Sequence, residues 1–197
     1  WVRTFPQAEF KYVNAGIGGT TSQFGVARAQ DDLLDAEPDF VIAEFSVNDE
    51  STGHFEETYE GLVRKILSSK SHPALMLVHN VCYNNGASAE LVHSRIARHY
   101  NIPSVSMQST LYKALLNCRF DNRRITPDDL HPNDCGHELV SMVITKRLEQ
   151  IKNTVKAEYE TAKSQRAAAQ PDAGAAALLP EPLTANAYED SVRYRNY

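Results

Sequence analysis

The sequence is poor in cysteine and has no excess of basic residues. Its cysteines, Cys82, Cys118 and Cys135, are odd in number and lack paired spacing, so no disulfide framework is predicted. Free and mostly buried thiols are the ordinary interpretation. The 20 Lys and Arg residues against 25 Asp and Glu residues give a formal net charge of −5. This balance lacks the basic footprint of a nucleic-acid-binding protein, and we expect no such partner.

Long hydrophobic runs are missing as well. No apolar run approaches the roughly 20 residues that a membrane-spanning helix needs, so no membrane span is expected. No secretory signal peptide is recognisable either. The chain opens at Trp1 instead of a methionine, and residues 1–11 have the pattern of a helix end followed by a turn. We therefore expect the natural start to lie upstream, which leaves the compartment, cytoplasmic or secreted, undetermined.

Short apolar segments alternate with amphipathic segments over most of the chain. Strands are predicted at 11–15, 39–47, 74–80 and 102–107. The middle two are nearly continuous apolar runs, typical of strands buried on both faces of a parallel sheet. Helices are predicted between the strands and again at 136–151. This order predicts an α/β fold with a parallel sheet, in which ligands bind at the carboxyl ends of the strands.

The composition changes after the predicted α/β region. Residues 1–152 carry the alternating pattern and form the predicted main domain. Residues 153–177 are polar and rich in alanine, and they predict a helical extension followed by a linker. Residues 178–197 contain prolines and scattered apolar residues without a period. We interpret this last segment as an irregular tail that begins another module.

The strongest local motif is Asp128-Asp129-Leu130-His131-Pro132-Asn133. A carboxylate close to a histidine can accept the hydrogen of one ring nitrogen, and the other nitrogen then faces outward as a base. We expect Asp128 to take this part, because Asp129 has less reach for a side-on hydrogen bond. The alternative is a surface loop with an incidental histidine.

Two other loops carry groups that can bind a negatively charged oxygen. Residues 16–22, Gly-Ile-Gly-Gly-Thr-Thr-Ser, follow a predicted strand and open a helix, where bare N–H groups bind anions. A phosphate loop is disfavoured because its lysine and its glycine spacing are absent, and a tight turn is the alternative. Asn48 ends the next strand as a neutral donor suited to an oxyanion hole, unless it only closes a turn. Asp49, His79 and Asn80 lie at the same predicted edge and are candidates for lining a pocket.

In chain order, these loops resemble the characteristic blocks of the SGNH (GDSL-type) hydrolases. Residues 14–22 resemble the second block of that family, with Gly19 as its oxyanion glycine. Val47-Asn48-Asp49 resembles the third block, with Asn48 as its oxyanion asparagine, and residues 128–133 resemble the fifth. The resemblance covers about residues 1–150 and implies a flavodoxin-like, three-layer α/β/α fold.

The first block of the family, Gly-Asp-Ser after the first strand, occurs nowhere in the chain. The resemblance therefore implies that the first strand and the nucleophilic serine lie upstream, and that this sequence is a truncated piece. Ser46 stands where the third block usually has a glycine. Ser22 and Ser46 are the alternative nucleophiles, but Ser22 is predicted to cap a helix and Ser46 to turn inside the Asn48 loop.

The resemblance implies a serine ester hydrolase that works through an acyl-enzyme without a metal or organic cofactor. His131 is then the general base, Asp128 its orienting carboxylate, and Gly19 and Asn48 the oxyanion donors. Acetyl esters of carbohydrate are the first expected substrate class, followed by lipid esters and thioesters. The piece alone is expected to be inactive.

Two alternatives remain beside the serine hydrolase. One is a non-catalytic module on the same fold, with the glycine loop holding an anionic ligand. The other is a metal-dependent hydrolase whose ligands are His131, Cys135 and His137, although their spacing is irregular for a zinc site.

Overall fold

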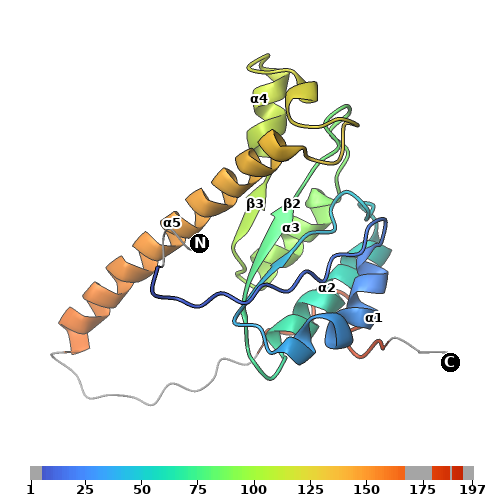
Figure 1. Ribbon diagram of the computed structural model, residues 1–197. Coiled ribbons are helices and arrows are strands. Elements are labelled where there is room, and N and C mark those ends of the chain that lie inside the picture. Colours follow the sequence, from blue (N-terminus) through green and yellow to red (C-terminus); the bar gives the residue numbers. More distant parts are fainter. Residues whose placement is uncertain (1–5, 167–178, 187, 193–197) are drawn as a thin grey trace.

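A computed structural model of the chain describes residues 6–166, 179–186 and 188–192. These residues form a parallel sheet flanked by helices (Figure 1), so the predicted α/β class is confirmed. The elements are α1 (Ser22–Asp32), β1 (Phe40–Ala43), α2 (Gly53–Leu67), β2 (Ala74–His79), α3 (Glu90–His99), β3 (Ser104–Ser106), α4 (Lys113–Leu116) and α5 (Asp134–Arg166). Short helical turns lie at η1 (Leu34–Ala36), η2 (Gln108–Tyr112) and η3 (Asn122–Arg124).

The described strands lie in the order β1-β2-β3, and each neighbouring pair is parallel. β2 is central and is buried on both faces, as predicted. Its side chains alternate, because successive residues of a strand point to opposite faces. Leu75 and Leu77 join one hydrophobic cluster, whereas Val78 joins another. The sheet therefore separates two cores.

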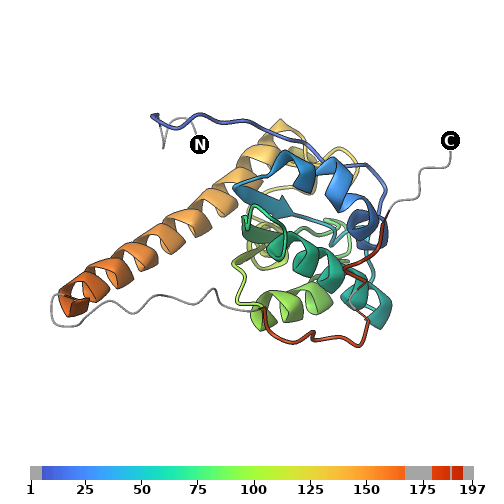
Figure 2. The ribbon, with the colours of Figure 1, turned by 90° about the horizontal axis from the view of Figure 1, so that it is seen from below.

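Helices cover both faces of the sheet (Figure 2). On one face, α1, α2 and α3 pack over β1 and β2. In α2, the buried residues Tyr59, Leu62, Val63 and Ile66 recur at spacings of three and four, which places them on one side of the helix. On the other face, the first turns of α5 pack with η2 against β2 and β3. Three layers result, as the family resemblance implied.

Two predicted strands differ from the structure. Residues 11–15 are extended but form no strand, and Tyr12 is 86% exposed. No strand pairs with this segment within the described part of the chain. The strand predicted at 39–47 ends at Ala43, because the N–H groups of Asn48 and Asp49 both turn back onto the carbonyl of Phe45. It is also buried on one face only, since Ile42 is 43% exposed.

The last helix runs through the predicted helical extension. α5 has 33 residues and projects beyond the sheet (Figure 1). Among the described residues, no helix is both long enough and apolar enough to cross a membrane. The predicted linker lies mostly outside the described residues. The described parts of the tail, 179–186 and 188–192, return to α2 and α3, where Leu183 packs against the core.

Candidate functional site

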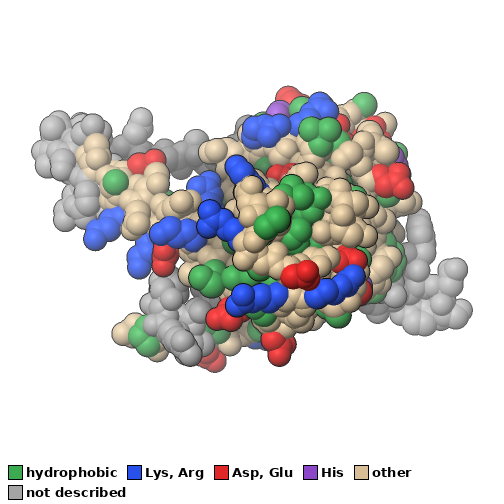
Figure 3. Space-filling view, turned by 90° about the horizontal axis from the view of Figure 1, so that it is seen from above, with side chains coloured by type: hydrophobic (Ala, Val, Ile, Leu, Met, Phe, Trp, Pro, Cys, Tyr) green, Lys and Arg blue, Asp and Glu red, His purple; other side chains and the backbone are tan. Residues whose placement is uncertain are grey.

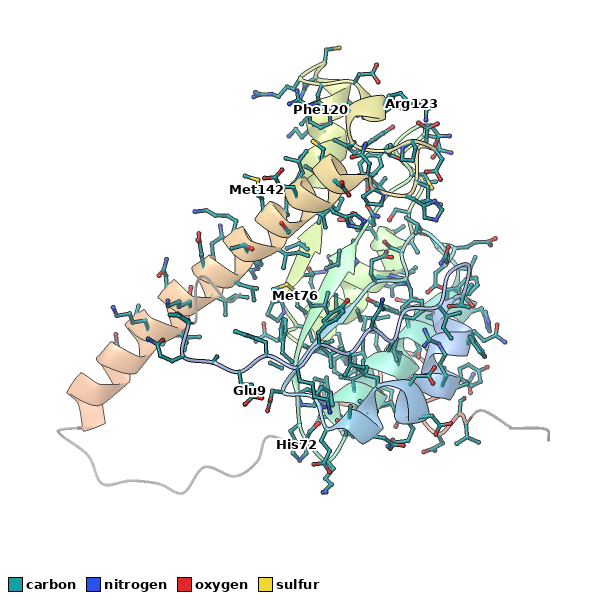
Figure 4. All side chains as sticks on the ribbon, in the orientation of Figure 1. Glu9, His72, Met76, Phe120, Arg123 and Met142 are labelled. Carbon is teal, nitrogen blue, oxygen red and sulfur yellow. The ribbon has the colours of Figure 1, made fainter. Side chains whose placement is uncertain are left out.

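Figure 1 shows the loop before α1 and the loop after β1 on the right side of the molecule, with the loop before α5 above them. They carry the expected residues Gly19, Asn48 and His131, respectively. Figure 4 labels Arg123, beside the loop before α5, at this upper end, and His72 at the opposite end. The site therefore lies where the loop that follows β1 leaves the sheet.

Asp128 and His131 form a hydrogen-bonded pair. The Nδ1 of His131 donates to Oδ2 of Asp128 at 2.7 Å, while Oδ1 accepts the backbone N–H groups of His131 at 2.8 Å and of Leu130 at 3.1 Å. These hydrogen bonds, the one from the imidazole first, hold the pKa of Asp128 well below its usual range. The His131 side chain is 75% exposed. An ionised carboxylate thus orients an imidazole whose Nε2 is accessible.

Asp129 takes a different part in the same loop. It has a positive φ of 70°, and its side chain makes no hydrogen bond to His131 among the described residues. Its carboxylate accepts from Asn122 and, at 3.0 Å, from Nη2 of Arg123. Its carbonyl accepts the N–H of Tyr83 at 2.7 Å. Asp129 therefore braces the loop, whereas Asp128 contacts the histidine.

The ends of this loop are tied together at the start of α5. The N–H of Asn133 donates to the carbonyl of Ile125 at 2.9 Å, and Oδ1 of Asn133 caps the helix by accepting the N–H of Gly136 at 3.0 Å. A Cβ on Gly136 would lie 2.2 Å from the Ile125 carbonyl oxygen. Only glycine allows this close approach, so the helix start fixes the base of the loop that carries His131.

The glycine loop and Asn48 are in direct contact. Nδ2 of Asn48 donates one hydrogen to the carbonyl of Thr20 at 3.0 Å, and the amide carries a second N–H. Gly19 has a positive φ of 68°, a conformation that other residues rarely adopt. Its N–H has no partner within the described part of the chain. Asn48 therefore contacts the residue that directly follows Gly19.

Asp49 and His79 are covered instead of lining an open pocket, which differs from the sequence expectation. Asp49 is 6% and His79 1% exposed. Asp49 turns inward because its Oδ1 accepts the N–H of Ser22 at 2.8 Å and its Oδ2 lies 3.0 Å from Nε2 of His93. Burial, and then the charge of His93, lower the pKa of His79 to about 4. Asn80 is half-buried and accepts the hydroxyl of Tyr83 at 3.2 Å.

His93, the partner of Asp49, was not among the candidate residues that the sequence indicated. Its position carried a signal, since it lies three and four residues before the buried Ile96 and Ala97 and so shares their face.

The loop of His131 connects to the loop of Asn48 through intermediates. Tyr83 donates its N–H to the carbonyl of Asp129 and its hydroxyl to the side chain of Asn80. The backbone carbonyl of Asn80 in turn accepts a hydrogen bond from Oγ of Ser46 at 2.9 Å. No hydrogen bond of the described residues joins His131 directly to Gly19 or Asn48.

The alternative nucleophiles are engaged elsewhere. Ser22 is fully buried, and its Oγ lies 2.7 Å from Oγ1 of Thr58. Ser46 is also fully buried, and its Oγ lies 2.6 Å from Oε1 of Glu44. Burial raises the pKa of Glu44, although the hydrogen bonds from Ser46 oppose the shift. Both hydroxyls therefore hold loops in place and are closed to a substrate.

The metal alternative requires at least three ligand side chains close together. Within the described part of the chain, no three His, Cys, Asp or Glu side chains gather so that they could hold a metal ion. His131, Cys135 and His137 are thus not arranged as a zinc site.

A groove lies apart from these loops, between η2 and α5. It is lined by Leu111, Leu139, Met142 and Val143, with Lys146 and Arg147 beside them. Figure 3, which views the molecule from above, shows Lys and Arg side chains along the side from which α5 projects. None of the expected site residues lines this groove.

Known proteins resemble this chain over most of its length. A thioesterase 1/protease 1/lysophospholipase L1 from Escherichia coli K12 is 26% identical over 158 residues, which are 75% of this chain and 71% of that protein. The crystal structure of a two-domain esterase (CEX) active on acetylated mannans is 59% identical with a TM-score of 0.86, and covers 100% of this chain and 49% of that one. The same esterase co-crystallised with mannopentaose is 60% identical over 98% of this chain, with a TM-score of 0.84.

This chain therefore spans about half the length of the two-domain esterase. A lipase/acylhydrolase from Enterococcus faecalis, 22% identical with a TM-score of 0.57, covers 76% of this chain and 80% of its own and shares the fold. Residues 1–139 match the GDSL-like Lipase/Acylhydrolase family. Because this match spans more than half of the sequence, the chain belongs to the GDSL-like lipase/acylhydrolase family.

Proposed function

We propose that this chain supplies the general base, its orienting carboxylate and two oxyanion donors to a serine ester hydrolase. The observation that carries the proposal is the 2.7 Å hydrogen bond between His131 Nδ1 and Asp128 Oδ2, with the imidazole exposed. In this geometry the carboxylate fixes the tautomer that leaves Nε2 free to accept a proton. The contact between Asn48 and the Gly19 loop supports the second half of the assignment.

The proposed substrates are short acyl esters, first of all acetyl groups on carbohydrate. This choice is supported by the similarity to an esterase active on acetylated mannans, which is 60% identical over 98% of this chain. Lipid esters and thioesters come second, because the Escherichia coli relative is a thioesterase and lysophospholipase.

We propose that the nucleophile is a serine from outside this sequence, carried on a strand next to β1. Three observations support this placement. β1 pairs only with β2 among the described residues, so its other edge is open. Residues 11–15 run extended without a ladder partner, and Ile42 is exposed on the face beside that edge. A first strand inserted between 11–15 and β1 would pair both and cover Ile42.

The proposed mechanism gives each of these groups a stated role. Nε2 of His131 accepts the serine proton as the serine oxygen attacks the ester carbonyl, and Asp128 stabilises the imidazolium that forms. The N–H of Gly19 and the second N–H of Asn48 donate to the developing oxyanion, each contributing about 3 kcal/mol. The imidazolium then protonates the leaving alcohol. His131 next takes a proton from the water that attacks the acyl-enzyme, and returns it to the serine oxygen as the carboxylic acid leaves.

The proposal is tested by acetate release from 4-nitrophenyl acetate and from acetylated mannan. The assay compares the 197-residue chain with the full-length natural protein, each with and without His131→Ala. We expect turnover only from the full-length protein, and its loss on His131→Ala. Strong activity of the short chain that survives His131→Ala would refute the role of His131. A full-length protein that binds acetylated mannan without turnover, and that a phosphonate ester does not label, would support the non-catalytic alternative.

A further inference from the structure

A buried histidine lies beneath the two loops that carry the proposed oxyanion donors. His93, from α3, places Nε2 3.0 Å from Oδ2 of Asp49, and both side chains are fully buried. The other oxygen of this carboxylate accepts the N–H of Ser22 at 2.8 Å, at the first residue of α1. A single carboxylate therefore connects α3 to the end of the glycine loop.

Asp49 and its neighbour Asn48 hold the glycine loop at two points. The Asn48 amide donates to the carbonyl of Thr20, which directly follows Gly19. The Asp49 carboxylate accepts the N–H of Ser22. The direction in which the Asn48 amide points, and the distance between that amide and the Gly19 N–H, thus depend on where the Asp49 carboxylate is held.

The carboxylate is held by a ring that cannot easily move. The imidazole of His93 stacks on the ring of Tyr59 from α2, with centroids 3.6 Å apart and 14° between the planes. Both residues are 0% exposed. A hydrogen bond to an ionised acceptor is shorter and stronger than one between neutral groups, particularly away from water. The position of His93 is therefore passed on to Asp49 and, through it, to both loops.

We propose that His93 is a positioning residue of the oxyanion hole. Through Asp49 it keeps the Gly19 N–H and the Asn48 amide at the separation that a carbonyl oxygen requires. This inference rests on the proposed ester hydrolase function. It adds a residue that touches neither the substrate nor the reacting atoms.

The test uses His93→Phe in the full-length natural protein. Phenylalanine keeps an aromatic ring on Tyr59 but removes the donor to Asp49, and His93→Gln restores a donor at nearly the place of Nε2. His99→Phe, on the exposed side of the same helix, is the matched control. Rates are measured per active site, counted by titration with a phosphonate ester, so that misfolded molecules do not contribute.

We expect His93→Phe to lower kcat for 4-nitrophenyl acetate by roughly 10- to 100-fold with little change in KM, since small misplacements of catalytic groups cost up to about that much. His93→Gln should recover most of the rate, and His99→Phe should leave it unchanged. A value of kcat within twofold of the parent in His93→Phe would overturn the inference while the esterase proposal, tested by His131→Ala, stands.

A second measurement does not depend on activity. Amide hydrogen exchange of Ser22 and of its neighbours in the glycine loop should become faster in His93→Phe and return towards the parent rate in His93→Gln. Unchanged protection of the Ser22 amide in His93→Phe would equally overturn the inference, even in a chain that hydrolyses nothing.

Discussion

At the scale of single residues, the pair Asp128 and His131 could be found from the sequence because its two members are only three positions apart. The choice between Asp128 and Asp129 was also accessible, since it follows from reach within one short loop. The pairing of His93 with Asp49 could not be found from the sequence, because the two residues are 44 positions apart. Only the packing of α2 against α3 brings them together. Contacts of this range leave no local pattern.

The orienting role of Asp128 predicts a large effect of Asp128→Asn in the full-length protein. The amide favours the wrong tautomer of His131, so kcat should fall by about 10⁴-fold, as when the corresponding carboxylate of a serine protease is replaced. Asp129→Asn is the matched control, since Asp129 holds the loop but does not touch the imidazole, and its kcat should fall far less than that of Asp128→Asn. Equal losses in both variants, measured with 4-nitrophenyl acetate, would contradict the assignment.

The burial of His79 predicts a stability change with pH. Its folded pKa, lowered to about 4 from 6.5, means that the unfolded chain takes up this proton first as the pH falls. The contribution is constant above pH 6.5 and is lost between 6.5 and 4, by about 3 kcal/mol at most. Urea unfolding at several pH values should show a flatter profile for His79→Phe. Identical profiles for both proteins would show that His79 does not titrate in this way.

At the scale of elements, the start of α5 sets the loop of His131. The capping residue Asn133 was recognisable in the sequence, but the close contact between Gly136 and the Ile125 carbonyl was not, because it depends on how the loop closes. The helix and its polar, alanine-rich extension were both predicted in place, and the structure describes the helix from Asp134 to Arg166.

Gly136→Ala should displace the start of α5. A Cβ 2.2 Å from the Ile125 carbonyl oxygen cannot be accommodated without a shift of the backbone. Overpacking of this kind costs about 1–3 kcal/mol, and the displacement should also lower kcat through His131. Chemical denaturation and the aryl acetate assay measure the two effects. Gly53→Ala is the control, because a Cβ there meets nothing within 4 Å. It should change neither the stability nor kcat strongly.

The tail segment docks on α2 through a buried carboxylate. Glu60 accepts the N–H groups of Leu183 and Thr184. Burial alone would raise the pKa of Glu60, but the hydrogen bonds from Thr184, Tyr100 and Leu183 outweigh it and lower the pKa. The sequence showed no period in this segment, because these contacts use backbone groups and not an apolar stripe.

Glu60→Gln should loosen this docking. The amide offers one acceptor where the carboxylate offers two, and a hydrogen bond to a charged group contributes about 1.5–3 kcal/mol, so the Leu183 and Thr184 amides should exchange at least about tenfold faster. Because the folded pKa is lowered, the docking is fully present above pH 4.5 and is lost as the pH falls through the folded value. Exchange rates equal to those of the parent at pH 7 would contradict this account.

At the scale of the whole molecule, alternation of apolar and amphipathic segments sufficed to predict a parallel sheet between helical layers. It failed at 11–15 and at the outer face of β1, where a correct apolar pattern has no partner among the described residues. An apolar strand pattern indicates that a segment can join a sheet. The segment forms a strand only when a neighbouring strand is present to pair with it. The same open edge is where the proposed serine-bearing strand would insert.

The central claim is that His131, Gly19 and Asn48 act on one serine. The most direct measurement is a crystal structure of the full-length natural protein after reaction with a phosphonate ester. We predict phosphorus bonded to a serine oxygen beside Nε2 of His131, with a phosphonyl oxygen accepting the Gly19 N–H and the Asn48 amide. Phosphorus bonded elsewhere, or a phosphonyl oxygen that neither Gly19 nor Asn48 contacts, would contradict the account.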